Sequence, residues 1–205
     1  MCSSDLELFF EAKNMGLLGQ ERHLKDSIKG IYPLRLEETK EVDGRQIVIR
    51  PARPDDERRI QEHFYELEKQ DIVSRFFHEK TTFVHDEVEG ISQIDYVKNF
   101  TIVAVLGEFG FETVIGIGEY FLDNRKNVAE VAFSVSGDWQ KKGIGGILIN
   151  KLAAAALENG ILGLVAFTSP ENKGMIKLFK KLPYKITTSI NYDTLTLSCK
   201  FDEFE

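Results

Sequence analysis

The chain has 205 residues, of which 42% are hydrophobic and 29% charged, so it can form one domain with or without an extension. This composition excludes a collagen-like or wholly disordered chain. The 26 Lys and Arg against 33 Asp and Glu leave a net charge of -7, which argues against nucleic-acid binding and suits a cationic partner.

Residues 1–32 differ in pattern from the rest of the chain, because their apolar side chains are mixed with charges and two glycines. Two interpretations remain open. The segment forms short amphipathic helices that dock on the main domain, or it is the remnant of a linker from a longer polypeptide. In both cases we place the domain itself at residues 33–205.

From residue 33 onward the apolar spacing predicts alternating strands and helices. Asp43-Gly44 predicts a tight hairpin turn, because both positions tolerate a positive φ. The expected elements are, in order, strands at 34–36 and 46–50, a helix beginning at Pro54, a helix at 71–78, a loop at 80–90, strands at 101–106, 113–122 and 128–135, a helix after Gly143, a strand at 161–168, a helix at about 175–182, and a closing hairpin of 184–190 and 194–201. This order indicates a mixed α/β layer structure.

Targeting and metal-binding signals are not evident in the sequence. The first residues lack a basic segment followed by an apolar one, and charged and polar residues interrupt the longest apolar region, 143–167. Cys2 and Cys199 form no disulfide framework, and neither they nor the four histidines show metal-ligand spacing. We therefore expect a soluble cytoplasmic protein without a metal or a membrane partner.

The stretch 131–146 carries the clearest chemical signal. An apolar strand ends at Val135, a short turn follows, and glycines at 143, 145 and 146 lead into a helix. Backbone amides at a glycine-rich helix start bind anions. A pyrophosphate is therefore the expected ligand, and Lys141 and Lys142 add positive charge to the site. The alternative is a glycine-rich helix start used only for packing.

Two phosphate-binding motifs do not fit this stretch. A P-loop needs a Gly-Lys followed by Ser or Thr at fixed spacing, which is absent. A dinucleotide fingerprint needs a third glycine at position 148 and an early βαβ unit, and here the glycines follow a late strand.

The stretch resembles the Gcn5-related N-acetyltransferase (GNAT) superfamily. Its signature, Gln or Arg, two residues, Gly, one residue, Gly or Ala, matches 140–145, and its helix-start Asn matches Asn172. The resemblance covers about residues 45–200. A closer likeness is to bacterial Pat-type protein lysine acetyltransferases, carried by Tyr32-Pro33, Ile49-Arg50-Pro51-Ala52-Arg53-Pro54, Ser74-Arg75-Phe76-Phe77, Gln93-Ile94-Asp95-Tyr96 and Ala129-Glu130-Val131-Ala132.

This resemblance implies the GNAT (acyl-CoA N-acyltransferase) fold, a mixed and mostly antiparallel central sheet with helices on both faces. It also implies acetyl-CoA as the acyl donor, with its thioester carbonyl polarised by a strand amide near Ser134. The implied cofactor-binding residues are Phe133, Ser134 and Val135 along the pantetheine arm, and Gln140, Lys141, Lys142, Gly143, Ile144, Gly145, Gly146 and Asn172 around the pyrophosphate.

Glu130 matches the position of the family's general base. An acceptor lysine, with a pKa of about 10.4, must lose a proton before it can attack. Glu130 sits on an otherwise apolar strand, where burial would favour the neutral carboxyl group. The alternatives are an exposed strand glutamate without a catalytic role, and Glu119 on the preceding strand as the base, although a solvated carboxylate is the more natural reading of Glu119.

One position departs from the family pattern. Many GNAT enzymes carry a Tyr seven residues after the Asn, where it protonates the leaving thiolate. Here that residue is Phe179, so water serves, or no acid is needed. We interpret the nearby Tyr184 as a packed strand residue.

The sequence therefore predicts an acetyl-CoA-dependent N-acetyltransferase that works by direct transfer. The expected acceptor is a lysine-bearing protein, such as an acyl-CoA synthetase, and nucleic acid is not an expected partner. A small-molecule amine as acceptor and a non-catalytic acyl-CoA-binding regulatory module remain as alternatives.

Overall fold

Eight strands form one sheet in the computed structural model, which describes residues 32–204 apart from 78–79, 81, 84–94 and 109. Their spatial order is β1-β2-β3-β4-β5-β6-β8-β7, and only β5 and β6 pair in parallel among these described strands. The strands are β1 (Glu38–Val42), β2 (Arg45–Pro51), β3 (Asn99–Leu106), β4 (Thr113–Asp123), β5 (Val128–Val135), β6 (Gly163–Thr168), β7 (Tyr184–Asn191) and β8 (Thr194–Phe204).

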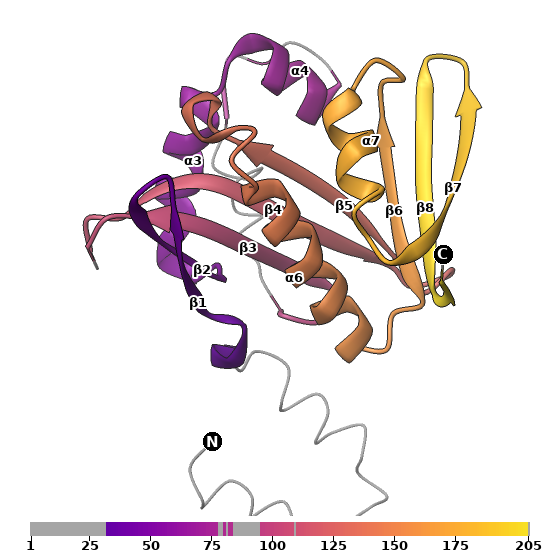
Figure 1. Ribbon diagram of the computed structural model, residues 1–205, viewed down its shortest axis with the longest axis horizontal. Coiled ribbons are helices and arrows are strands. Elements are labelled where there is room, and N and C mark those ends of the chain that lie inside the picture. Colours follow the sequence, from indigo (N-terminus) through magenta and orange to yellow (C-terminus); the bar gives the residue numbers. More distant parts are fainter. Residues whose placement is uncertain (1–31, 78–79, 81, 84–94, 109, 205) are drawn as a thin grey trace, which may run out of the picture. The chain divides into compact units, whose positions relative to one another are not determined.

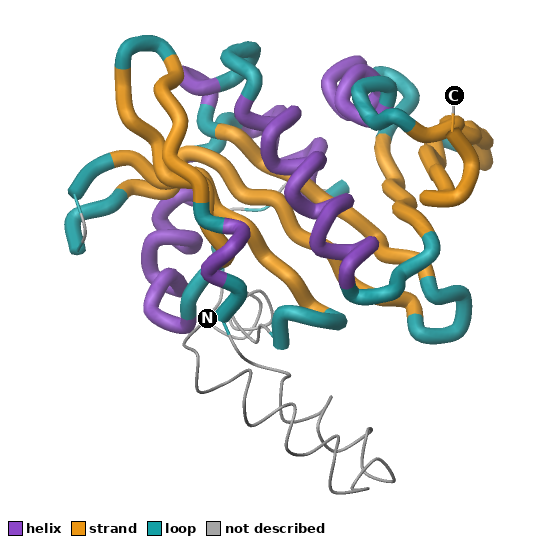
Figure 2. The backbone as a smooth tube through the Cα atoms, turned by 60° about the horizontal axis from the view of Figure 1, so that its bottom comes forward, coloured by secondary structure: helices purple, strands orange, loops and turns teal. Residues whose placement is uncertain are grey.

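Helices cover both faces of this sheet (Figures 1 and 2). The helices α3 (Glu57–Glu66) and α4 (Lys69–Phe76) lie on one face, where Ile60 and Phe64 join a core cluster with Val103 and Ile117. On the other face lie α6 (Ile144–Glu158) and α7 (Lys173–Phe179), within a second and larger cluster. The expected mixed, mostly antiparallel sheet with helices on both faces is confirmed. None of the described helices is long and apolar enough to cross a membrane.

The first expected strand is wrong. Residues Leu34–Leu36 form a 3₁₀ turn, held by bonds from the Leu36 amide to the Pro33 carbonyl (2.9 Å) and from the Glu37 amide to the Leu34 carbonyl (3.0 Å). The turn buries Leu36 and leaves Leu34 exposed. In a strand these two side chains would point to the same face of the sheet. Two further 3₁₀ turns, Pro54–Asp56 and Gly137–Trp139, precede α3 and follow β5.

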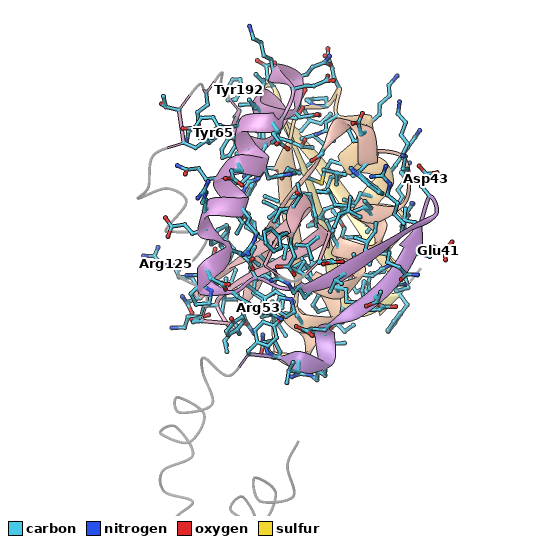
Figure 3. All side chains as sticks on the ribbon, turned by 90° about the vertical axis from the view of Figure 1, so that its left-hand side faces the viewer. Glu41, Asp43, Arg53, Tyr65, Arg125 and Tyr192 are labelled. Carbon is cyan, nitrogen blue, oxygen red and sulfur yellow. The ribbon has the colours of Figure 1, made fainter. Side chains whose placement is uncertain are left out.

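The hairpin turn predicted at Asp43-Gly44 is confirmed. Both residues have positive φ, +56° and +73°, and Asp43 stands at the tip of the β1–β2 hairpin (Figure 3). The remaining elements agree with the expected ones to within a few residues. The predicted extension lies outside the described residues, except for Tyr32, and so does most of the predicted loop at 80–90.

β5 and β6 separate soon after they meet. Two residue pairs join them, Ala129 with Leu164 and Glu130 with Val165, and beyond these the strands diverge with α7 beside the gap (Figure 1). β6 instead pairs along its whole length with β8. Gly163 allows this close approach, because a Cβ there would lie 2.1 Å from the Cys199 carbonyl oxygen. The edge of β5 from Val131 to Val135 is therefore left facing the gap.

A buried ion pair fixes the start of α3 to β2. The Arg50 guanidinium lies 2.5 and 2.8 Å from the two carboxylate oxygens of Asp56, which also accepts the Arg53 amide at 2.8 Å. Burial alone would raise the pKa of Asp56. The hydrogen bonds from Arg50 and the Arg53 amide outweigh burial and hold that pKa below its ordinary value of 3.8.

Replacing Asp56 with Asn should therefore destabilise the fold in a pH-dependent way. We expect a loss of about 3 kcal/mol in the free energy of unfolding at pH 7, because the buried Arg50 guanidinium loses the nearer of its two carboxylate partners, Asp56 and Glu112. The folded-state pKa of Asp56 lies below the unfolded one, so its stabilisation is complete above about pH 4 and declines as the pH falls. Urea denaturation at pH 7, 5 and 3.5 measures this difference, which should narrow at the lowest pH. The exposed Asp55→Asn is the matched control, and an equal loss in both variants would contradict the prediction.

Candidate functional site

A cavity of about 480 Å³ opens where β5 and β6 separate. Its walls are the end of β5, the loop of residues 140–143, the first turn of α6, the start of α7, and Asp71 and Ser74 of α4. The predicted cofactor-binding residues that line it are Phe133, Ser134, Val135, Gln140, Lys141, Gly143, Ile144, Gly145, Gly146 and Asn172. The structure thus brings together residues from four separate elements.

Lys142 is the exception among the predicted binding residues, since it is not among the described residues that line the cavity. Its ammonium group donates to Asp43 at the hairpin tip (2.6 Å) and lies 5.0 Å from the centroid of the Trp139 ring. The backbone reverses at Lys141 and Gly143, which both have positive φ, and Lys141 faces the cavity while Lys142 faces the hairpin. The expectation that Lys142 reinforces the anion site is therefore not met.

The start of α6 offers backbone amides to the cavity. Gly143 precedes the helix with φ +94°, and the helix ladder begins where the Ile147 amide donates to the Gly143 carbonyl (3.2 Å). The amides of Ile144, Gly145 and Gly146 therefore have no acceptor within the helix. A Cβ on Gly145 would lie 3.4 Å from Leu178 and no closer to any other group, so the glycines leave open space beside these donors. Amides and space together fit a pyrophosphate.

Two lysines of the cavity were missed in the sequence. Lys177 of α7 and Lys181 just after it line the wall together with Lys141, and the Lys181 ammonium lies 3.5 Å from where a Cβ on Gly146 would stand. Lys173, Lys177 and Lys181 recur every four residues. That spacing places them along one side of a helix, and it could have indicated a cationic wall.

Gln140 and Asn172 shape the cavity by holding its walls. The Gln140 side-chain amide donates to Asp71 (2.8 Å) and to the Val135 carbonyl (3.1 Å), which ties α4 to the end of β5. Burial raises the pKa of Asp71. The Asn172 side chain accepts the Met175 amide (3.0 Å) and donates to Thr168 (2.9 Å), which caps α7 against β6.

The two sides of the β5 backbone have different roles. The Ser136 amide donates to the Ile115 carbonyl of β4 (3.0 Å), and the register pairs Ser134 with Ile117. Bonded and open positions alternate along an antiparallel strand, so the amides of Phe133 and Val135 point toward the gap. These neighbours of Ser134 are therefore the strand amides available to a ligand.

Ser134 bonds to a buried histidine that the sequence analysis weighed only as a metal ligand. Oγ of Ser134 lies 2.9 Å from Nε2 of His63, on α3, while Nδ1 of His63 lies 3.1 Å from the Val114 carbonyl and 3.2 Å from Oγ of Ser136. Burial lowers the pKa of His63 to about 4, although the bond to Val114 raises it. The imidazole is therefore neutral at pH 7. No local sequence signal joins residues 71 positions apart.

Two carboxylates lie on the face of β4 and β5 that α3 and α4 cover. Glu130 is exposed, contrary to the burial expected for it, and pairs with Phe121 across the strands. Glu119 is 1% exposed and forms an ion pair with Arg75 of α4. The interpretation of Glu119 as a solvated carboxylate is therefore wrong. Burial lowers the pKa of Arg75 to about 10, and the charge of Glu130 opposes this.

Phe179 and Tyr184 are both packed residues. Phe179 is fully buried in the α6–α7 core cluster. Tyr184 packs on Phe201 and Phe204, with ring centroids 5.0 and 5.4 Å apart, as expected. Among the described residues, no group of three or more His, Cys, Asp or Glu is placed to hold a metal ion.

Comparison with known proteins agrees with this architecture. The model of the acetyltransferase (GNAT) family matches residues 60–184. An acetyltransferase of Pseudomonas aeruginosa is 27% identical over 133 residues, which are 65% of this chain and 72% of that protein. The acetyltransferase Pat of Mycolicibacterium smegmatis is 27% identical over 140 residues, 68% of this chain but 41% of Pat, so the match spans less than half of that relative.

Solved structures share the fold. The GNAT domain of S. lividans PAT superimposes with a TM-score of 0.74 at 25% identity, covering 83% of this chain and 99% of that one. A putative acetyltransferase of Salmonella typhimurium, yncA, solved with its cofactor acetyl-CoA, gives 0.61 at 19% identity, covering 77% and 95%. At that identity the likeness shows the fold alone.

Gly145→Glu should abolish binding of a pyrophosphate-bearing ligand while the fold survives. The new carboxylate would stand beside the α6 amides and repel the phosphates, and the 3.4 Å clearance at Leu178 leaves room for its Cβ. Gly145→Ala is the matched control and should retain most of the affinity, because it adds a Cβ without charge. Titration calorimetry with CoA measures both variants. If the folded Gly145→Glu variant binds CoA normally, the pyrophosphate does not bind at the start of α6.

Proposed function

Because the chain belongs to the GNAT family of acetyltransferases, we propose that it transfers the acetyl group of acetyl-CoA to a lysine side chain of a protein. The observation that carries this proposal is the cavity between β5 and β6. It joins the open amides of α6 and three lysines to the unpaired edge of β5. A thioester donor with a pyrophosphate and an amide-bearing arm matches that combination of groups.

Different residues of the cavity bind different parts of the donor. The amides of Ile144, Gly145 and Gly146 and the ammonium groups of Lys141, Lys177 and Lys181 bind the pyrophosphate. The amides of Phe133 and Val135 bind the pantetheine arm along the gap and polarise the thioester carbonyl at its end. When bound, acetyl-CoA supplies an acyl group activated as a thioester.

Glu130 is the proposed general base. A lysine at pH 7 must be deprotonated at a cost of about 4.6 kcal/mol, from a pKa of about 10.4 at 1.36 kcal/mol per pH unit. The exposed carboxylate of Glu130 lies on the same strand as the donor-binding amides and can take this proton directly or through a water molecule. Exposure also leaves it accessible to a large acceptor.

A protein lysine is proposed as acceptor over a small amine for two reasons. The chain is similar to relatives named Pat and PAT, at 27% and 25% identity. In addition, the base lies on an exposed strand position outside the described lining of the cavity. An enclosed pocket would be expected for a small amine.

Acetyl-CoA should raise the melting temperature, because it binds the native state only. At a concentration 100 times its Kd, the stabilisation of about 2.7 kcal/mol corresponds to a rise of about 5 °C or more for a domain of this size. ATP and NAD should have much smaller effects, since neither offers the pantetheine arm that β5 binds. Thermal denaturation with each ligand measures this, and equal shifts from all three would count against the proposed donor.

Glu130→Gln should lower turnover by about 10² to 10⁴, the usual value of general-base assistance. Acetyl-CoA affinity should change little, because Glu130 is not among the described residues that line the cavity. Raising the pH should partly restore the rate, since more acceptor is then already neutral. A pH–rate profile with one lysine peptide tests this against Glu203→Gln, a change at a partly exposed glutamate on β8. Near-normal turnover of Glu130→Gln at pH 7 would show that Glu130 is not the base. If the wild type binds acetyl-CoA but transfers no acetyl group, the alternative of a non-catalytic acyl-CoA-binding module is favoured.

A further inference from the structure

The hydrogen of the Ser134 hydroxyl has a defined direction. His63 is 1% exposed, and its Nδ1 faces the Val114 carbonyl oxygen at 3.1 Å. A carbonyl oxygen can only accept, so Nδ1 carries the ring hydrogen and Nε2 is the unprotonated nitrogen. The 2.9 Å contact between Nε2 and Oγ of Ser134 is therefore a bond that Ser134 donates.

This bond restricts what Ser134 can offer to a ligand. A serine hydroxyl has one donor hydrogen and two acceptor lone pairs. Because the hydrogen is directed at His63, Ser134 presents only lone pairs to the cavity that it lines. A carbonyl or phosphate oxygen of a ligand cannot form a hydrogen bond with Oγ of Ser134, whereas an N–H group can donate one to it.

The position of Ser134 indicates which N–H group it meets. The amides of Phe133 and Val135 occupy the edge of β5 that faces the donor, but the Ser134 side chain points to the face covered by α3. Glu130 projects from that same face, four residues earlier on β5 and about 13 Å away between Cα atoms at 3.3 Å per residue. Ala132 lies between them and adds only a methyl group. An amine bonded to Ser134 and lying toward Ala132 therefore reaches Glu130 through one water molecule.

We propose that Oγ of Ser134 accepts a hydrogen bond from the acceptor amine, and that His63 is a positioning residue that fixes the Ser134 hydroxyl for this contact. The proposal rests on the proposed function, since it assigns the amine that Glu130 deprotonates. The bond to Ser134 holds one N–H of the amine and leaves the nitrogen lone pair free to face the thioester carbon.

A serine nucleophile is the alternative meaning of a serine bonded to a histidine. The burial of His63 argues against it, because a pKa of about 4 makes the imidazole a weak base at neutral pH. The hydroxyl keeps its proton, and no acyl-serine forms. The same low pKa keeps His63 neutral between pH 6 and 9, so the orientation of Ser134 does not vary over the working range.

Kinetics of the full chain with a lysine peptide test this assignment. We expect Ser134→Ala to lower kcat/KM for the peptide about tenfold, the value of one hydrogen bond of about 1.4 kcal/mol. The Kd for acetyl-CoA should stay within twofold, because the backbone amides remain. Ser136→Ala is the matched control. It removes a hydroxyl that also contacts His63, but Ser136 is not among the described residues that line the cavity, and kcat/KM should stay within twofold.

Two variants of His63 separate positioning from mere stability. His63→Leu removes the acceptor and frees the Ser134 hydrogen, so it should lower kcat/KM for the peptide, but less than Ser134→Ala does, because the hydroxyl keeps its lone pairs and loses only its fixed direction. His63→Gln places an amide oxygen near the former Nε2 and should restore most of the rate. The melting temperatures of both variants measure any loss of stability independently of these kinetic comparisons.

Several outcomes would overturn the proposal. Wild-type kcat/KM in Ser134→Ala would do so, as would equal losses of peptide and acetyl-CoA affinity, or an acetylated Ser134 peptide after incubation with acetyl-CoA alone. These results leave the proposed function standing as long as the wild type acetylates the peptide. A wild type that binds acetyl-CoA but acetylates no amine overturns both proposals.

Discussion

The candidate site depends on the early separation of β5 from β6. Unpaired backbone amides and carbonyls are costly unless something else binds them, and here one edge of β5 leaves its parallel partner after two residue pairs. Gly163 makes the separation possible by letting β6 approach β8 more closely than a Cβ would permit. The cavity, the helix start at Gly143 and the α7 lysines all border the resulting gap. A ligand with its own amides completes the hydrogen bonding that the sheet leaves open.

β5 serves two partners because its backbone and its side chains point in different directions. The edge amides of Phe133 and Val135 face the gap, the proposed place of the donor. The side chains of Glu130 and Ser134 project toward α3 and α4, the proposed place of the acceptor. In this proposal the two substrates meet at one strand without competing for the same groups. This arrangement suits direct transfer, in which both must be bound together.

Local pattern was sufficient to predict most elements and most of the residues that line the cavity. The Asp43-Gly44 turn, the strand at 128–135 and the motif at 140–145 are each specified by neighbouring residues, and the structure contains them all. Features that depend on distant packing were not predictable. Lys142 is directed away by Asp43, a residue 99 positions earlier. Glu119 is buried by Arg75 from α4, and nothing near His63 in the sequence indicates its bond to Ser134. Leu34–Leu36 has strand-like residues but folds as a turn behind Pro33.

The buried pair of Glu119 and Arg75 gives the acceptor side of the site a fixed electrostatic character. Glu119 stands opposite Ala132, between the positions of Glu130 and Ser134, and it holds the Arg75 guanidinium beside the same stretch of strand. Glu119 balances the charge of this guanidinium, so the Glu130 carboxylate nearby leaves these three groups with a net negative charge, which attracts a cationic lysine. In the proposed reaction the acceptor lysine is thus drawn in as its ammonium form, and a base within the site must still remove its proton.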